Sequence, residues 1–295
     1  MVPCSISFTT ERRLFQSTHT ATSSRTTTSS KTCLWGKYSR QTPKKTKINK
    51  ADVLSYERSL CDEKGYSYIL GSDETGRGSI AGPVVTASCC ILTLQDPTTQ
   101  QLIDPNELPT SALLPPNSGI KDSKQLSPNE REAIYDIVME NSHTYAVSVA
   151  QRSNTEIDET GNILTSTMEC FVESIQDLAE HKVFPHAESI VSNPTEIASS
   201  CYGIVDGKKA PKLSLDASFP CRPMVKADQQ VYTVALASII AKVTLDRMFL
   251  EFHQAYPHYN FDQNLGYATK EHIEAIHQHG PCPLHRMTTK SLKGR

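Results

Sequence analysis

From residue 66 onward, short apolar runs alternate along the chain with stretches in which apolar residues recur every three or four positions. Short apolar runs bounded by turn residues indicate strands, and we expect strands at 66–70, 84–92, 145–150 and 201–205. Apolar residues at helical spacing predict helices over 128–140, 164–179, 231–256 and 271–278. Strands that alternate with helices in this way predict one α/β domain, with helical additions toward the C-terminus.

Local signals sharpen three of these elements. Ser127 and Glu130 form a capping box with Pro128 at the first helical position, so a helix should begin there. Residues 231–243 are apolar nearly all round, which is typical of a helix buried in the middle of a domain. The strand at 84–92 directly follows a glycine-rich turn, so it can pair with the strand before it as a hairpin. Cys89 and Cys90 should then point to opposite faces.

Composition separates the first 50 residues from the rest of the 295-residue chain. Residues 1–50 contain ten basic side chains and one acidic one, which leaves 20 basic and 31 acidic residues, a net charge of −11, for 51–295. The first segment is also rich in Ser and Thr, so it cannot form a core, whereas 51–295 should be the folded domain. This composition predicts an organellar transit peptide, for a plastid or a mitochondrion. The alternative is a disordered basic tail on a cytoplasmic or nuclear protein.

The remaining composition predicts a soluble protein with reduced thiols. Hydrophobic residues make up 38% of the chain, and no apolar run approaches the ~18 residues that a membrane span requires. The nine cysteines form no CxxC pair and no regular framework, which favours a reducing compartment.

The most informative stretch for chemistry is 71–83, which reads GSDETGRGSIAGP. An apolar strand leads into the adjacent carboxylates Asp73 and Glu74, and a turn containing Gly76, Arg77 and Gly78 follows. Carboxylate oxygens are hard ligands that suit Mg²⁺ or Mn²⁺. Glycines beside them allow the backbone to approach a substrate closely. The stretch therefore predicts a metal-dependent enzyme that acts on a nucleotide or a phosphate-bearing polymer.

Two further acids extend this hypothesis. Asp206 and Asp228 each follow a short apolar or β-prone run, so both can reach one rim of the sheet together with the first pair. Four convergent carboxylates suit phosphodiester hydrolysis by two metal ions. Taken singly, Asp206 also fits an ordinary turn and Asp228 a surface acid. A zinc site in the histidine- and cysteine-rich stretch 272–285 is a weaker alternative, because its spacing matches no common zinc motif.

The motifs of this chain, and the order in which they occur, resemble those of ribonuclease HII, the type 2 ribonuclease H. The resemblance is to its bacterial single-chain form, here with an N-terminal extension. The matching motifs cover about residues 66–290 and are Asp73-Glu-Thr-Gly-Arg-Gly78, Asp122-Ser-Lys124, Glu156-Ile-Asp158, Val205-Asp-Gly207, Val225-Lys-Ala-Asp228, Ala237-Ser-Ile-Ile-Ala-Lys-Val243 with Asp246, Gly266-Tyr267 and His279-Gly-Pro-Cys-Pro-Leu-His-Arg286. Relative to compact family members, residues 93–119 and 185–199 look like insertions.

The resemblance implies a ribonuclease H-like fold, with a central mixed β-sheet flanked by helices. It also implies a monomeric endoribonuclease that uses Mg²⁺ or Mn²⁺, cleaves the RNA strand of RNA–DNA hybrids, and incises duplex DNA 5′ of embedded ribonucleotides to leave a 3′-hydroxyl and a 5′-phosphate. Two rival functions remain open: another nuclease or strand-transfer enzyme of this fold, or an inactive hybrid-binding protein.

The resemblance assigns roles to individual positions. Four carboxylates match the catalytic metal ligands: Asp73, Glu74, Asp206 and Asp228. The 2′-hydroxyl, which distinguishes RNA from DNA, is matched to the turn of Gly76, Arg77 and Gly78. Tyr267 matches an aromatic residue that packs on the next sugar, and Ser123 and Lys124 match phosphate contacts.

The chain departs from the family pattern at several positions. Lys208 replaces the usual Asn, Leu245 replaces a basic residue, and the segment from Met287 to Lys290 lacks an aromatic residue. These changes concern affinity and leave the four carboxylates intact. Asp246 lies about 25 Å beyond Asp228 along one helix at 1.5 Å per residue, so we expect it to be structural or to support the metal ligands only indirectly.

Overall fold

The computed structural model describes residues 54–92, 126–188, 193–215, 219–290 and 292, which belong to a compact unit spanning Thr46–Arg295. Its strands are β1 (Tyr68–Thr75), β2 (Val84–Ile91), β3 (Tyr145–Arg152), β4 (Cys201–Asp206) and β5 (Cys221–Met224). Its α-helices are α1 (Ser55–Lys64), α2 (Pro128–Glu140), α3 (Asn154–Thr160), α4 (Ile163–Leu178), α5 (Phe184–Glu188), α6 (Pro194–Ser199), α7 (Tyr232–Ala255), α8 (Phe261–Asn264) and α9 (Lys270–His279). Short π and 3₁₀ segments are η2 (Ala179–Val183), η3 (Ala227–Gln229) and η4 (Pro257–Tyr259).

The five strands form one mixed sheet in the order β3-β2-β1-β4-β5. The hairpin predicted between the first two strands is confirmed, since β1 and β2 are antiparallel, as are β2 and β3. β4 runs parallel to β1 on one side and to β5 on the other. The carboxyl ends of β1 and β4 therefore lie side by side at one edge of the sheet.

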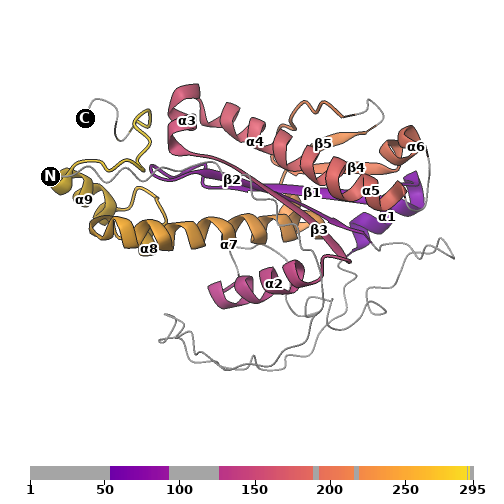
Figure 1. Ribbon diagram of the computed structural model, residues 1–295, viewed down its shortest axis with the longest axis horizontal. Helices are drawn as coiled ribbons and strands as arrows, with labels where there is room; N and C mark the ends of the chain where they lie inside the picture. The colour runs from indigo at the N-terminus through magenta and orange to yellow at the C-terminus, as the bar shows by residue number, and fades with distance from the viewer. Residues whose placement is uncertain (1–53, 93–125, 189–192, 216–218, 291, 293–295) are drawn as a thin grey trace, which may run out of the picture. The chain divides into compact units, whose positions relative to one another are not determined.

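Helices cover both faces of this sheet (Figure 1): α4 packs on one face and α7 on the other. Cys89 belongs to the core beneath α7 and Cys90 to the core beneath α4, as the alternation of a strand requires. The apolar character of α7 all round is explained by its neighbours, because it packs against the sheet, α2 and α8. The predicted mixed α/β fold is confirmed.

Gly71 allows the close approach of α7 to β1. A Cβ atom built on Gly71 would lie 2.3 Å from the backbone of Thr233 and of Val234, a separation that side chains do not tolerate. Any larger residue here would push the start of α7 away from β1. The glycine thus fixes the distance between the strand that carries Asp73 and the helix that follows Asp228.

The structure also corrects parts of the prediction. The first strand does not end at Leu70 but continues to Thr75, so both members of the acidic pair lie within it. The elements α1, α3, α5, α6, α8 and β5 were not predicted, since nearly all are too short to show periodicity. The segment 185–199, expected to be an insertion relative to compact family members, contains most of α5 and all of α6. Residues 1–50 and 93–119 lie outside the described part of the chain, and none of the described helices is both long and apolar enough to cross a membrane.

Candidate active site

Three of the four predicted carboxylates lie at the adjacent ends of β1 and β4. The parallel register pairs Ser72 with Val205, so Asp73 and Asp206 are the next residue on each strand. Asp73 and Glu74 are neighbours on β1 and therefore point to opposite faces of the sheet. The Ser72 hydroxyl bonds Ser88, which bonds Ser174 of α4, so Glu74 lies on the α4 side and Asp73 on the α7 side.

The fourth carboxylate comes from the turn that precedes α7. Asp228 is buried in η3, and the preceding amide, the N–H of Ala227, donates to Oδ1 of Asp206 at 2.7 Å. This bond ties η3 to the end of β4. Asp206 and Asp228, 22 positions apart in the sequence, are thereby brought to one place, as the sequence hypothesis requires.

The electrostatics of Asp73 show how closely the acids are gathered. Burial raises the pKa of Asp73 well above its usual range, and the nearby charges of Glu74 and then Asp206 raise it further. The Ser238 hydroxyl of α7 is hydrogen bonded to the Asp73 carboxylate and opposes this shift. A bound cation would relieve this crowding of negative charge.

Glu74 has a cationic partner in the neighbouring turn. Nη1 of Arg77 donates to Oε1 of Glu74 at 2.6 Å, with 47% of the Arg77 side chain exposed and 14% of the Glu74 side chain. The contact orients the Glu74 carboxylate and places the exposed guanidinium beside the acids. In the described part of the chain, no three His, Cys, Asp or Glu side chains form a preformed metal cage. The donor set nevertheless fits a hard divalent ion, since it consists of carboxylate oxygens on adjacent strand ends.

The glycine turn and Tyr267 lie against each other. A Cβ atom on Gly78 would sit 3.4 Å from Cε1 of Tyr267, an ordinary contact, and the tyrosine is 42% exposed. Gly76 has φ +86°, and a Cβ atom there would lie 2.6 Å from the Pro83 carbonyl oxygen. Backbone conformation therefore explains Gly76 without any ligand. Space for a substrate is a better explanation for Gly78.

A buried arginine that was not singled out from the sequence holds this turn. Nε of Arg286 donates to the Gly82 carbonyl at 2.8 Å, Nη1 to Ser79 at 2.9 Å and Nη2 to Pro83 at 2.7 Å. Arg286 is only 1% exposed, and burial lowers its pKa to about 10, so it remains a cation at neutral pH. The side chain thus fixes three backbone carbonyls of the segment that follows Gly78.

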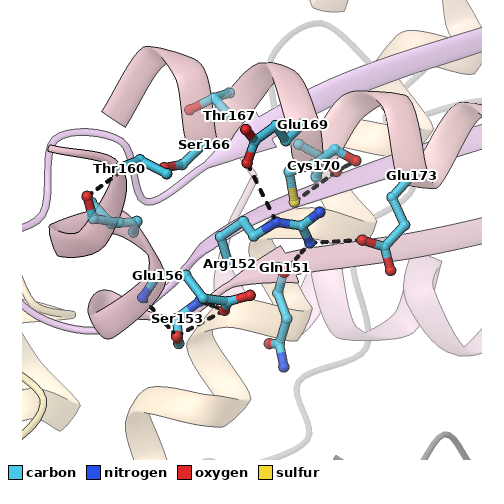
Figure 2. Close-up of polar contacts among 12 residues, drawn as sticks. Gln151, Arg152, Ser153, Glu156, Thr160, Ser166, Thr167, Glu169, Cys170 and Glu173 are labelled. Atoms are coloured by element: carbon cyan, nitrogen blue, oxygen red, sulfur yellow. Dashed lines mark hydrogen bonds and ion pairs between the residues drawn. The ribbon is translucent and has the colours of Figure 1, made fainter. Parts of the chain in front are cut away.

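Helix α3 anchors the segment that carries Arg286. Nδ2 of Asn154 donates to the Pro283 carbonyl at 2.8 Å, and Asp158 accepts from the Met287 amide at 2.7 Å. Figure 2 shows how α3 begins: Ser153 and Glu156 form a capping box directly after Arg152, the last residue of β3. Arg152 reaches Glu173 of α4 at 2.6 Å. The end of β3, α3 and the C-terminal segment are therefore one hydrogen-bonded support for the turn.

Two buried histidines connect Tyr267 to the same segment. Nδ1 of His272 donates to the Tyr267 carbonyl at 2.7 Å, so Nε2 of neutral His272 accepts from Nε2 of His285 at 3.1 Å. Nδ1 of His285 in turn accepts from the Cys282 amide at 2.9 Å. Burial lowers the pKa of both rings, for His285 to about 4, so the pair is neutral. These bonds give both rings structural partners, which argues against zinc.

The first turn of α7 is capped by Glu57, a residue that is distant in the sequence. Glu57 of α1 is fully buried, and its Oε1 accepts from the Thr233 amide at 2.9 Å, in the first turn of α7. Val231, at the N-cap position, provides no side-chain cap of its own. Burial raises the pKa of Glu57 to about 7, although the bond to the helix amide opposes the shift. Glu57 thus helps to fix the helix that begins just after Asp228.

The other predicted positions fall into two groups. Ser123 and Lys124 lie outside the described residues. Asp246 pairs with Lys242 at 2.5 Å and with Arg131 of α2 at 3.7 Å, so it holds α2 against α7. Its structural role is confirmed.

Comparisons with known proteins agree with this arrangement. A family model described as Ribonuclease HII matches residues 70–292. The chain is 35% identical over 245 residues to a ribonuclease HII of Caldanaerobacter subterraneus subsp. tengcongensis, covering 82% of this chain and 83% of the relative.

Solved structures show the same fold. A chain from the PCNA–RNase HII complex of Archaeoglobus fulgidus is 23% identical with a TM-score of 0.50, covering 77% of this chain and 97% of that one. Bst-RNase HIII in complex with Mn²⁺ is 20% identical with a TM-score of 0.54, covering 79% of this chain and 71% of that one.

Proposed function

Because the chain belongs to the ribonuclease HII family, we propose that this endoribonuclease of RNA–DNA hybrids also incises duplex DNA 5′ of single embedded ribonucleotides. The observation that supports this most is that Gly78, in the turn directly after Asp73 and Glu74, lies next to the exposed ring of Tyr267. A strand carrying one ribonucleotide offers a single 2′-hydroxyl as its distinguishing group. A glycine backbone and an exposed aromatic ring side by side can contact neighbouring sugars of one strand.

The carboxylates would hold two divalent ions, Mg²⁺ or Mn²⁺, with Asp73, Glu74, Asp206 and Asp228 as ligands. Bound there, the ions would activate water and stabilise charge on the departing oxygen in an in-line displacement. Ser238 orients Asp73, and the Ala227 amide orients Asp206.

The protein's own groups would position the ribonucleotide. The backbone of Gly76 and Gly78 would approach the 2′-hydroxyl, and Tyr267 would pack on the following sugar. Arg77, exposed and beside Glu74, is placed to meet a phosphate. Charge-assisted hydrogen bonds of guanidinium to phosphate are stronger than neutral ones. We further propose that the protein acts as a monomer, because every proposed group comes from one chain.

Analysis of the cleavage products tests this proposal. A labelled duplex with one ribonucleotide is incubated with Mg²⁺, with Mn²⁺ and with chelator, beside an all-DNA duplex. We expect a single incision 5′ of the ribonucleotide, leaving a 3′-hydroxyl and a 5′-phosphate, only with a divalent ion. Cleavage of long hybrids without incision at a single ribonucleotide would refute the finer assignment, and cleavage in chelator would refute the metal mechanism.

A further inference from the structure

The cations of the described residues differ in whether they have anionic partners. Those on the helices and around the glycine turn are mostly paired, as with Arg77 and Glu74, Arg152 and Glu173, and Lys242 and Asp246. Five exposed cations between β4 and η3 form no salt bridge with any described residue: Lys208, Lys209, Lys212, Arg222 and Lys226. We refer to these five as the basic strip.

The basic strip adjoins the carboxylate site on two sides. Lys208 and Lys209 follow Asp206 by two and three positions, and Lys226 precedes Asp228 by two. The Gly207 amide donates to the Met224 carbonyl at 3.0 Å, which holds the segment after β4 beside the segment after β5. With the bond from the Ala227 amide to Asp206, this places cations of the strip on both chain segments that deliver catalytic acids.

The charge of the strip contrasts with the rest of the domain. Residues 207–226 contain five of the 20 basic residues of 51–295 and one of its 31 acidic residues, Asp216. Without this segment the remaining domain has 15 basic and 30 acidic residues. An acidic protein that binds a polyanion must concentrate positive charge where the polyanion lies. The basic strip is such a concentration of positive charge, and it lies directly beside the carboxylates that would cleave the nucleic acid.

We propose that the basic strip binds backbone phosphates of the duplex next to the scissile position. The proposal rests on the proposed function, since it takes the occupant to be the nucleic acid held at the carboxylates. Phosphate contacts of lysine position a duplex and carry no sequence information. The strip should therefore contribute equally to binding of a hybrid and of an all-DNA duplex, unlike Gly78 and Tyr267.

The basic strip could bind phosphates, or its charge could only keep the exposed edge of the sheet soluble. The salt dependence of duplex binding distinguishes these two roles. We compare the full chain with Lys208→Gln/Lys209→Gln, both in an Asp228→Asn background so that substrate is not consumed. The control is Lys64→Gln/Lys182→Gln, which removes the same charge from two exposed lysines, one at the end of α1 and one in η2. Lys64 precedes β1 at the end of that strand opposite to Asp73, and Lys182 donates to the Val147 carbonyl of β3.

Affinity for a hybrid and for an all-DNA duplex is measured from about 50 to about 200 mM salt. The logarithm of affinity falls linearly with the logarithm of salt concentration, and each lost phosphate contact makes this line shallower by about 0.9. For the strip variant we expect the magnitude of the slope to decrease by about 1 to 2 on both duplexes. For the control we expect it to stay unchanged.

Equal slopes for the strip variant and the unsubstituted chain would refute the proposal, as would an equal fall in the control. Failure of the proposed function would be seen separately, as absence of ribonucleotide incision by the wild-type protein.

Discussion

Replacing Arg286 should uncouple the glycine turn from its support. The side chain donates three hydrogen bonds of 2.7–2.9 Å to buried carbonyls, and a methionine of similar length would leave all three without a donor. Hydrogen bonds to charged groups contribute about 1.5–3 kcal/mol each, but burial of the guanidinium offsets part of that sum. We expect Arg286→Met to lower the free energy of unfolding by about 3–5 kcal/mol.

Arg286→Lys keeps the charge and loses the planar fork, so it should be intermediate, with a loss of about 2 kcal/mol. The functional effect should exceed what unfolding explains, because the released carbonyls follow Gly78 directly. For folded Arg286→Lys we expect kcat/KM for a single-ribonucleotide duplex to fall about 10- to 100-fold, which corresponds to about 1.4–2.7 kcal/mol. Cleavage of a long hybrid, with many positions to engage, should fall less.

The assay combines urea unfolding with kinetics on both substrates, below the temperature at which either variant begins to unfold. Arg247→Lys, in a partly exposed ion pair with Glu132 of α2, is the matched control and should leave both measurements nearly unchanged. If Arg286→Lys is folded and keeps wild-type kcat/KM on the single-ribonucleotide duplex, the turn does not depend on this side chain and the reasoning fails.

Three further outcomes follow from the structure. Gly78→Ala and Tyr267→Ala should each lower incision at a single ribonucleotide about 5- to 30-fold, by analogy with about 1–2 kcal/mol for aromatic stacking; full activity and discrimination in both variants would contradict the ribose site. His285 has a folded-state pKa of about 4 against an ordinary 6.5, so the unfolded state binds the proton first and stability falls as the pH drops from 6.5 toward 4. Between pH 7 and pH 5 the wild-type protein should lose about 1–2 kcal/mol more stability in urea unfolding than His285→Gln, because the opposite effect of the raised Glu57 pKa is common to both; equal changes in the two proteins would disprove this origin. If residues 1–50 are only an organellar address, protein starting at Ala51 should show the salt slope of the full chain, whereas a shallower slope would identify a binding arm.

The parts of the fold that could be predicted are those with local causes. Ser127 and Pro128 specify the start of α2 by contacts within one turn, and β1 and β2 are joined by a short glycine-rich turn. The motifs also predicted Asp206 and Asp228 at one site, and the bond from the Ala227 amide to Asp206 brings the two segments together.

The parts that could not be predicted depend on distant partners. Arg286 bonds backbone carbonyls more than 200 positions away, and a carbonyl has no signature in the sequence. Glu57 caps a helix 176 positions away, so its isolated appearance in α1 suggests a surface acid. The split of Asp73 and Glu74 between two faces was missed because the strand was ended at Leu70.

The central claim is that carboxylates gathered at the ends of β1 and β4 and in η3 perform ribonucleotide-directed cleavage with a divalent ion. It is tested most directly by the incision rate on a single-ribonucleotide duplex at saturating Mg²⁺, for wild type, Asp228→Asn and the control Asp246→Asn. We expect Asp228→Asn to lose at least about 10²–10³-fold in rate while still binding the duplex, because the amide keeps the shape and loses the charge. Asp246→Asn should stay within about 10-fold of wild type, since it removes only a partly exposed ion pair. Wild-type turnover by Asp228→Asn would contradict the account.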